Sequence, residues 1–401
     1  MKTIDEQIKI IMKGVEDIID EKELKEKLEK AQKEKRQLIV KLGLDPSAPD
    51  IHLGHTVVLR KMKQLQDLGH KVIIIIGDFT GKIGDPTGKS KARKALTTEQ
   101  VLENAKTYEE QIFKVLDKEK TEVRFNSEWL AKLNFEEVIK LAATITVARM
   151  LEREDFKNRY ENQMPISVHE FFYPLMQAYD SVAIKADIEL GGTDQRFNLL
   201  MGRSLQREFN QESQIVMMMP LIEGLDGKDK MSKSLGNYIG IDEKAEVMYA
   251  KAMRIPDELI VKYYNLVTDV HPDEVNRIKL ELEEGKTNPR DIKMNLAREI
   301  VALYHGEEEA KKAEVEFKNV FQQGQIPTDI KTLQGSKDDF DLPEILVSNG
   351  VVKSKSEVRR LATQGGVKIN GEKVTNLAEV KVENELIVQI GKKIFVKVEL
   401  V

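Results

Sequence analysis

Two histidines stand close together in a segment whose residue types suit the binding of an anion. Residues 43–55 read Gly-Leu-Asp-Pro-Ser-Ala-Pro-Asp-Ile-His-Leu-Gly-His, and His52 and His55 are two of only six histidines in the chain. Histidine N–H groups can donate to phosphate oxygens, and Gly54 lets a flat base or a phosphate approach the backbone closely. An apolar run precedes the segment and a helical pattern follows it, so the helix dipole would also favour an anion here. The alternative is a turn with two solvent-exposed histidines.

A lysine-rich loop flanked by glycines, residues 227–236, is a second candidate. Such loops are usually solvated connections, but this one contains the run Lys230-Met-Ser-Lys-Ser234. Together with His52-Leu-Gly-His55, that run resembles the two signatures of the class I aminoacyl-tRNA synthetases. The resemblance implies catalysis by positioning and charge stabilisation on the phosphates of ATP. It implies four catalytic residues: His52, His55, Lys230 and Lys233. It also implies that Gly54 and Lys233 bind ATP.

A glycine-rich segment, residues 77–90, ends in Gly-Lys-Ser and invites comparison with a P-loop. The spacing excludes a P-loop, because Ile83 stands where that motif needs glycine. A similar segment follows the second strand in tyrosyl-tRNA synthetases. That resemblance implies that Asp85 meets the α-amino group of the amino acid, and that Lys89 and Arg93 lie near the pyrophosphate.

The residues that would select the amino acid share one helix face. Tyr173, Gln177 and Asp180 are spaced i, i+4 and i+7, and their apolar neighbours predict a buried helix, in which a carboxylate needs a partner. This segment closely resembles tyrosyl-tRNA synthetases, which implies that the tyrosine and glutamine meet the amino end of the substrate and that Asp180 accepts from the phenol. The commoner bacterial form has another tyrosine where this chain has Lys41. Phenol recognition is therefore expected to rest on Asp180 or on a residue that the sequence does not identify.

A second glycine-to-helix turn, residues 191–198, places Asp194 to accept from ribose hydroxyls, as acidic residues do in dinucleotide sites. The resemblance implies that Gly192 and Asp194 bind ATP. It also implies three further contacts to tyrosine: Gly43, Asp45 and Gln195.

Hydrophobic periodicity predicts the elements that position these groups. Strands are predicted at 38–40, 71–76, 121–126 and 182–188. Helices are predicted over 1–36, 56–68, 98–117, from 127, over 134–153, through most of 242–322, and at 342–348 and 354–363. Apolar centres without alternation are typical of parallel strands that are covered on both faces.

The predicted fold is α/β: a Rossmann-like parallel-sheet catalytic domain with a helical insertion, followed by an α-helical domain and a small α+β RNA-binding domain. The predicted boundaries are 1–225 for the catalytic domain, 226–325 for the signature loop and α-helical tRNA-binding domain, 326–339 for a linker and 340–401 for the last domain. Residues 356–371 resemble a small RNA-binding domain shared with a ribosomal small-subunit protein. The expected RNA face, on one helix and the next turn, is Lys353, Lys355, Arg359, Arg360 and Lys368.

Composition narrows the function further. The 401 residues include no cysteine, which excludes disulfides, thiolate metal sites and cysteine nucleophiles. The formal net charge is −5, so nucleic acid must meet a local basic surface. No signal-peptide pattern and no run of 18 apolar residues is present, which favours a cytoplasmic protein without a membrane.

The resemblance implies tRNA(Tyr), L-tyrosine and ATP as partners, and a homodimer formed by the helical insertion. No dedicated carboxylate cluster is visible, so Mg²⁺ is expected to arrive with ATP and no protein-bound metal is predicted. Two alternatives stay open. One is a tryptophanyl-tRNA synthetase, and the other is a non-catalytic RNA-binding protein on the same scaffold.

Overall fold

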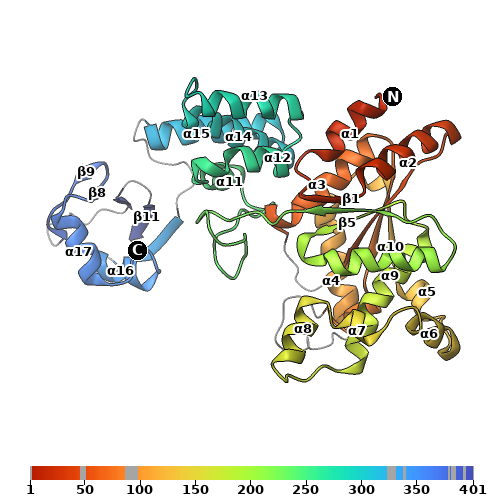
Figure 1. The fold of residues 1–401 in the computed structure, drawn as a ribbon. Helices are drawn as coiled ribbons and strands as arrows, with labels where there is room; N and C mark the ends of the chain where they lie inside the picture. The colour runs from red at the N-terminus through yellow and green to blue at the C-terminus, as the bar shows by residue number, and fades with distance from the viewer. Residues whose placement is uncertain are drawn as a thin grey trace. The chain divides into compact units, whose positions relative to one another are not determined.

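The structure is a computed structural model that describes residues 2–45, 51–85, 98–322, 331–336, 340–377, 380, 385–391 and 394–400. The chain forms two compact units, residues 1–307 and 308–401 (Figure 1). The predicted domain boundaries at 225/226, 325/326 and 339/340 stay predictions. Among the described residues, no helix is long and apolar enough to span a membrane.

The first unit is built on a six-stranded sheet of order β1-β6-β5-β2-β3-β4. Neighbouring strands from β6 to β4 run parallel, and β1 pairs antiparallel with β6. The strands are β1 Asp17–Ile19, β2 Ile39–Leu44, β3 Lys71–Ile76, β4 Thr121–Phe125, β5 Ile188–Gly192 and β6 Ile215–Met219. The sheet confirms the predicted Rossmann-like class, and the buried apolar runs of β3 and β6 show the sheet covered on both faces.

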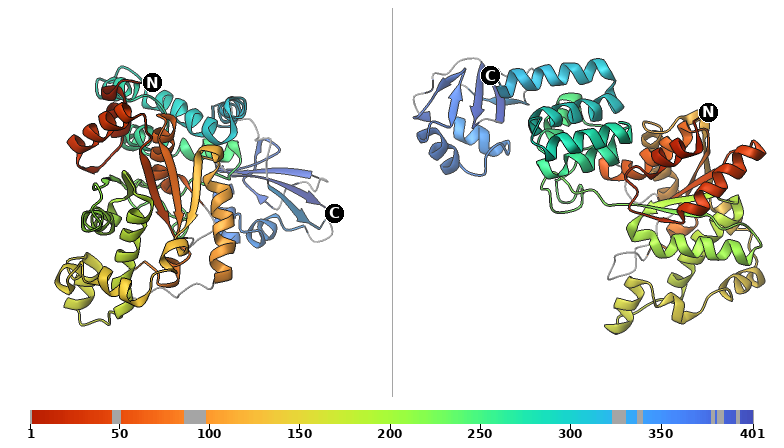
Figure 2. Two further views of the ribbon diagram at one scale, coloured as in Figure 1. Left: turned by 90° about the vertical axis from the view of Figure 1, so that its right-hand side faces the viewer. Right: turned by 45° about the horizontal axis from the view of Figure 1, so that its top comes forward.

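Two crossovers leave the centre of this sheet in opposite directions. Helix α3 (Leu53–Asp67) connects β2 to β3, and helix α10 (Arg196–Glu208) connects β5 to β6. Because parallel crossovers are right-handed, α3 and α10 lie on opposite faces and a crevice opens at the carboxyl ends of β2 and β5. Helix α9 (Phe172–Ile184) lies beside α10 (Figures 1 and 2). The fold thus brings the histidine signature and the predicted selectivity face to one edge.

The remaining helices of the first unit frame this core. Before the sheet lie α1 Ile4–Met12 and α2 Glu21–Glu34, and between β3 and α9 lie α4 Thr98–Ile112, α5 Ser127–Leu130, α6 Phe135–Ala142, α7 Val147–Met150 and α8 Glu154–Glu161. After β6 follow α11 Ala245–Ala252, α12 Ile260–Val267, α13 Pro272–Glu283 and α14 Pro289–His305. Short 3₁₀ turns are η1 Thr80–Lys82, η2 Lys118–Lys120, η3 Val168–Phe171, η4 Thr193–Gln195 and η5 Asp257–Leu259.

Two sequence predictions in this unit are wrong. The single helix expected over residues 1–36 is interrupted at Gly14, which has φ +68°, and the chain then forms β1 before α2. Glycine suits this turn because a Cβ would lie 2.9 Å from Leu266. The strand expected at 182–188 is also wrong. Helix α9 continues to Ile184 and ends at Lys185 in the left-handed conformation, and β5 starts only at Ile188.

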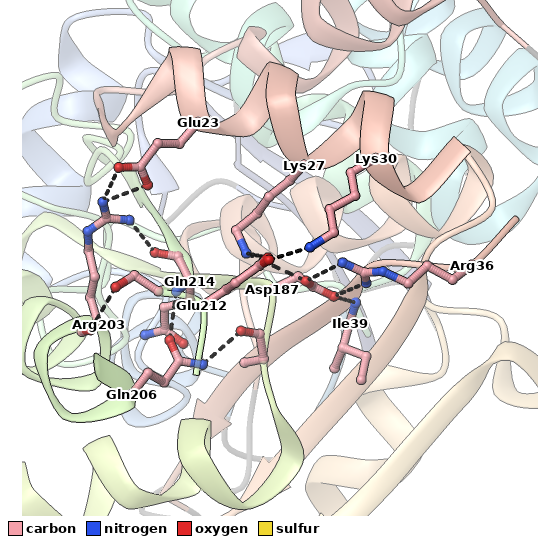
Figure 3. A network of polar contacts seen from close by, with 12 residues as sticks. Glu23, Lys27, Lys30, Arg36, Ile39, Asp187, Arg203, Gln206, Glu212 and Gln214 are labelled. Atoms are coloured by element: carbon pink, nitrogen blue, oxygen red, sulfur yellow. Dashed lines mark hydrogen bonds and ion pairs between the residues drawn. The ribbon is translucent and has the colours of Figure 1, made fainter. Parts of the chain in front are cut away.

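A polar network closes the opposite, amino-terminal edge of the sheet (Figure 3). Asp187, just before β5, accepts two bonds from Arg36 at 2.8 and 3.1 Å and one from the backbone N–H of Ile39 at 2.9 Å. Arg203 of α10 pairs with Glu23 of α2 at 2.6 Å. These bonds tie α2 and α10 to the starts of the central strands. The carboxyl edge is left for the cavity.

The second unit contains α15 Glu307–Gln322 and a separate five-stranded sheet of order β7-β11-β10-β8-β9. Its other elements are β7 Lys331–Gly335, α16 Leu342–Ser348, α17 Lys355–Thr363, β8 Val367–Ile369, β9 Glu372–Lys373, β10 Glu385–Ile390 and β11 Ile394–Leu400. The helices predicted at 342–348 and 354–363 are confirmed. Within the predicted linker, residues 331–335 form β7, which pairs in parallel with β11.

Candidate active site

A cavity of about 340 Å³ opens where β2, β3 and β5 end. Most of the tyrosine and nucleotide residues predicted from the sequence line it: Gly43, Asp45, Gly54, His55, Asp85, Tyr173, Gln177, Asp180, Gly192, Asp194 and Gln195. Lys89 and Arg93 lie outside the described residues. An open α/β sheet binds ligands at this position, outside the carboxyl ends of its strands.

Hydrogen bonds at the start of α3 fix the tautomers of both signature histidines. His52 is the N-cap, and its Nδ1 accepts from the backbone N–H of Gly54 at 3.1 Å. The Nδ1 of His55 accepts from the backbone N–H of His52 at 3.3 Å. Assigned from these bonds, the proton of each neutral ring is on Nε2. Each ring therefore presents one N–H donor. Position 54 requires glycine, because a Cβ there would lie 2.9 Å from the His52 ring.

Both histidines are neutral near neutral pH. Burial, reinforced by the charges of His55 and Lys233, lowers the pKa of His52 to about 3. Burial and Lys233 also lower the pKa of His55. The sequence analysis assigned these residues to neutralising phosphate charge. A neutral imidazole can donate a hydrogen bond to an anion but carries no positive charge to neutralise it.

Backbone pairing places the lysine loop against the histidine signature. The N–H of Leu53 donates to the carbonyl of Ile239 at 2.9 Å, and His52 forms an isolated antiparallel bridge with Gly240. Lys233 Nζ lies 5.6 Å from the ring centre of Tyr238, which is 6.1 Å from that of His52. His52, Lys230 and Lys233 do not line the cavity themselves. They stand beside it.

Asp45 and Tyr173 form one wall of the cavity. The Tyr173 hydroxyl donates to Asp45 Oδ2 at 2.8 Å, and Thr80 Oγ1 donates to the other oxygen at 3.1 Å. This approach requires glycine at position 77, because a Cβ there would lie 2.0 Å from Asp45 Oδ1. Burial and Asp45 raise the pKa of Tyr173 well above its usual value, so its hydroxyl stays protonated.

Asp180 is only 3% exposed, and two residues that the sequence analysis missed hold it. Trp129 Nε1 donates to Oδ1 at 2.8 Å, and Asn126 Nδ2 donates to Oδ2 at 3.4 Å. Burial raises the pKa of Asp180 to about 7, against the opposing charge of Lys41. The one signal in the sequence was that Trp129 is the only tryptophan.

Lys41 has its hydrogen bonds satisfied beneath the cavity rather than inside it. Its ammonium donates to Ser181 Oγ at 2.7 Å and to the Gln177 carbonyl at 2.9 Å, and pairs with Glu189 at 2.9 Å. An ammonium has three N–H donors, so these partners occupy all of them. Lys41 therefore replaces the expected tyrosine without taking over its contact to a ligand.

Two carboxylates, Asp85 and Asp194, lie close together in the lining of the cavity. Asp85 accepts from Arg153 at 3.0 Å and from Gln195 Nε2 at 2.9 Å. Burial, with the nearby charge of Asp85, raises the pKa of Asp194, and Lys230 opposes that shift. Among the described residues, no group of three or more His, Cys, Asp or Glu side chains is arranged to hold a metal ion.

The residues of the predicted RNA face lie on and just before α17 and in strand β8 of the second unit. Lys353, Arg359 and Arg360 are exposed on and before α17, whereas Lys368 belongs to strand β8 rather than to the next turn. Lys355 pairs with Asp341 at 2.7 Å and with Glu344 at 2.6 Å. Its charge is thus already balanced within the unit.

Comparison with known proteins yields consistent matches. The family model of class I tRNA synthetases (W and Y) matches residues 32–322, and the model of the tyrosine–tRNA ligase SYY-like C-terminal domain matches residues 321–398. The chain is 66% identical to tyrosine–tRNA ligase 2 of Clostridium acetobutylicum over 99% of both chains. It is 52% identical to the tyrosine–tRNA ligase of Thermotoga maritima, over 99% of this chain and 98% of that one.

Solved structures share the fold at lower identity. The tyrosyl-tRNA synthetase of Archaeoglobus fulgidus, solved with L-tyrosine, is similar with a TM-score of 0.61 at 24% identity. The match covers 78% of this chain and all of that one. A truncated mitochondrial tyrosyl-tRNA synthetase from Aspergillus nidulans gives a TM-score of 0.64 at 22% identity, covering 80% and 95%.

The bonding of His52 predicts its titration. Its folded pKa of about 3 lies below the ordinary 6.5, so as pH falls below 6.5 the unfolded chain binds a proton that the folded chain does not. We expect its imidazole to stay neutral with the proton on Nε2 down to about pH 5, and its contribution to stability to fall with pH. ¹⁵N NMR of histidine-labelled protein, with His52→Asn to assign the signal, measures this. A protonation midpoint near 6.5 would contradict the prediction.

Proposed function

The chain belongs to the class I tRNA synthetases of the tryptophan and tyrosine group, and from this membership we propose that it is an enzyme that activates L-tyrosine with ATP and transfers it to tRNA(Tyr). The observation that carries the choice of tyrosine is Asp180. A carboxylate, buried in the cavity lining and oriented by Trp129 and Asn126, can accept from a phenol. An indole N–H can also donate to this carboxylate, so the choice against tryptophan rests in addition on the tyrosine–tRNA ligases to which the chain is 66% and 52% identical.

The proposed reaction needs no nucleophile from the protein. The tyrosine carboxylate attacks the α-phosphate of ATP and pyrophosphate leaves. A hydroxyl of the terminal ribose of tRNA then attacks the carbonyl of the adenylate, and AMP leaves. Mg²⁺ enters as the substrate complex with ATP. The Nε2–H groups of His52 and His55 donate to phosphate oxygens, and Lys230 and Lys233 offset the charge that develops there. Lys89 and Arg93 are proposed to act beside the pyrophosphate.

The proposed substrate contacts follow the walls of the cavity. Gly54, Gly192 and Asp194 receive the nucleotide, with Asp194 at the ribose. Tyrosine binds with its phenol on Asp180 and its amino end near Asp85. The other contacts proposed for tyrosine are Gly43, Asp45, Tyr173, Gln177 and Gln195.

We propose a homodimer through the helical insertion. Large apolar side chains are exposed there, although such residues are normally buried. They are Phe135 (80% exposed), Val168 (74%), Tyr160 (65%), Val147 (63%) and Ile139 (54%). A second copy of the chain would cover them, and sedimentation equilibrium measures the mass. We place the reaction in the cytoplasm, where tRNA is used in translation.

Pyrophosphate exchange into ATP, assayed with each of the twenty amino acids, tests the activity. We expect tyrosine to support exchange and tryptophan and phenylalanine not to. Exchange with tryptophan would favour the other branch of the family. No exchange with any amino acid, in folded protein, would favour the non-catalytic RNA-binding alternative.

Asp180→Asn should reduce selectivity for tyrosine over phenylalanine. The substituted amide turns an N–H toward the phenol or toward Asn126, so the ratio of kcat/KM values should fall by about tenfold to a hundredfold. In the parent, kcat/KM for tyrosine should rise with pH through about 7 as Asp180 ionises, and this step should vanish in the variant. Asp187→Asn, at the opposite edge of the sheet, is the buried-carboxylate control. Selectivity kept in Asp180→Asn would place phenol recognition elsewhere.

The double substitution Arg359→Ala/Arg360→Ala should weaken tRNA binding and leave tyrosine-dependent exchange unchanged. Removing two phosphate contacts should raise the KM for tRNA and reduce the slope of log affinity against log salt by about two. Lys397→Ala is the matched control, because Lys397 is already paired with Glu385 and Glu399. An unchanged KM and salt slope would exclude this helix from the RNA interface.

A further inference from the structure

Asp85 and Gln195, which line the cavity, belong to a closed ring of four hydrogen bonds. Arg153 Nη2 donates to Asp85 Oδ1 at 3.0 Å, and Gln195 Nε2 donates to Asp85 Oδ2 at 2.9 Å. Asn198 Nδ2 donates to Gln195 Oε1 at 2.8 Å, and Arg153 Nη1 donates to Asn198 Oδ1 at 3.1 Å. The ring joins the segment after η1, the start of α10 and the start of α8. Each Asp85 oxygen is held from a different element, which fixes the plane of the carboxylate.

Arg153 enters the ring from the helical insertion. It is the N-cap residue of α8, and its side chain is only 5% exposed. Its third nitrogen, Nε, pairs with Asp155 Oδ1 at 2.7 Å, and the guanidinium lies 5.3 Å from the ring centre of Phe156. One planar fork therefore serves three acceptors at once. Lysine, a single flexible point charge, cannot reproduce that geometry.

Arg153 also supplies positive charge where carboxylates crowd. Burial raises the pKa of Asp155 and of Asp194, and the charge of Asp85 adds to the rise in both. Arg153 is paired with two of them. Removing the guanidinium would leave Asp85 and Asp155 to repel each other in a partly buried site. Asp85 would then lose the bond that Arg153 makes to Oδ1, while Gln195 still holds Oδ2.

We propose that Arg153 is a positioning residue for recognition of the α-amino group of the substrate. It does not line the cavity, so it acts through Asp85 directly and through Gln195 by way of Asn198. This inference rests on the proposed function, in which Asp85 receives the ammonium group of tyrosine. An ammonium contact made in both the ground state and the transition state lowers KM more than it raises kcat.

The test compares tyrosine with 3-(4-hydroxyphenyl)propionate, which has the phenol and carboxylate of tyrosine but no amino group. The full-length variants are Arg153→Gln, Arg153→Lys and Asp85→Asn. Arg159→Gln is the matched control, because Arg159 is equally buried in α8 but pairs with Glu170 outside the ring. The readouts are KM and kcat for tyrosine in exchange, and the inhibition constant of the analogue.

We expect Arg153→Gln to raise the KM for tyrosine about tenfold or more, with kcat and the inhibition constant of the analogue changed less than about threefold. Arg153→Lys should show a smaller change in the same direction, and Arg159→Gln should not separate the two ligands. If Asp85→Asn separates the ligands and neither Arg153 variant does, the positioning role is wrong and the role of Asp85 stands. If Asp85→Asn weakens both ligands equally, the proposed amino-group contact and this inference both fail.

Discussion

The site depends on a short antiparallel contact between two segments far apart in the chain. The bond from Leu53 to Ile239 and the bridge between His52 and Gly240 place the lysine loop beside the start of α3. Neither signature is complete alone. This backbone pairing brings the fixed N–H donors of the histidines and the lysine side chains of the loop to one place. Because the contact uses main-chain groups, the side chains of both segments stay available for other contacts.

Local pattern was enough to predict most of the framework. Apolar runs located β2 and β3, and alternation located β4. The i, i+4, i+7 spacing placed Tyr173, Gln177 and Asp180 on one helix face. The failures have physical causes. The apolar residues within 182–188 suit a helix or a strand equally, and in the structure Val182 packs in a core cluster with Met201 and Leu205 of α10. Residues 1–36 have helical periodicity on both sides of Gly14, and this pattern does not show the break. The positive φ of Gly14 turns the chain after the first helix.

The partners of the site residues could not be predicted, because they come from distant segments. Asn126 and Trp129 reach Asp180 from the N-cap and the body of α5, and Arg153 reaches Asp85 from the helical insertion. No spacing rule relates such positions. Lys41 shows the same limit. The sequence shows that Lys41 stands where a tyrosine is commoner, but not that Glu189 and Ser181 bind it.

The hydrogen bond between Trp129 and Asp180 gives this protein an internal optical reporter. Trp129 is the one tryptophan in the chain, so all of the indole emission comes from a ring whose N–H donates to Asp180. Indole fluorescence responds to the charge and solvation of its nearest neighbours. A ligand that displaces water from Asp180 or accepts its proton changes that environment directly. Ligand binding in the cavity can therefore be measured by the tryptophan fluorescence of the unlabelled protein, without turnover and without RNA.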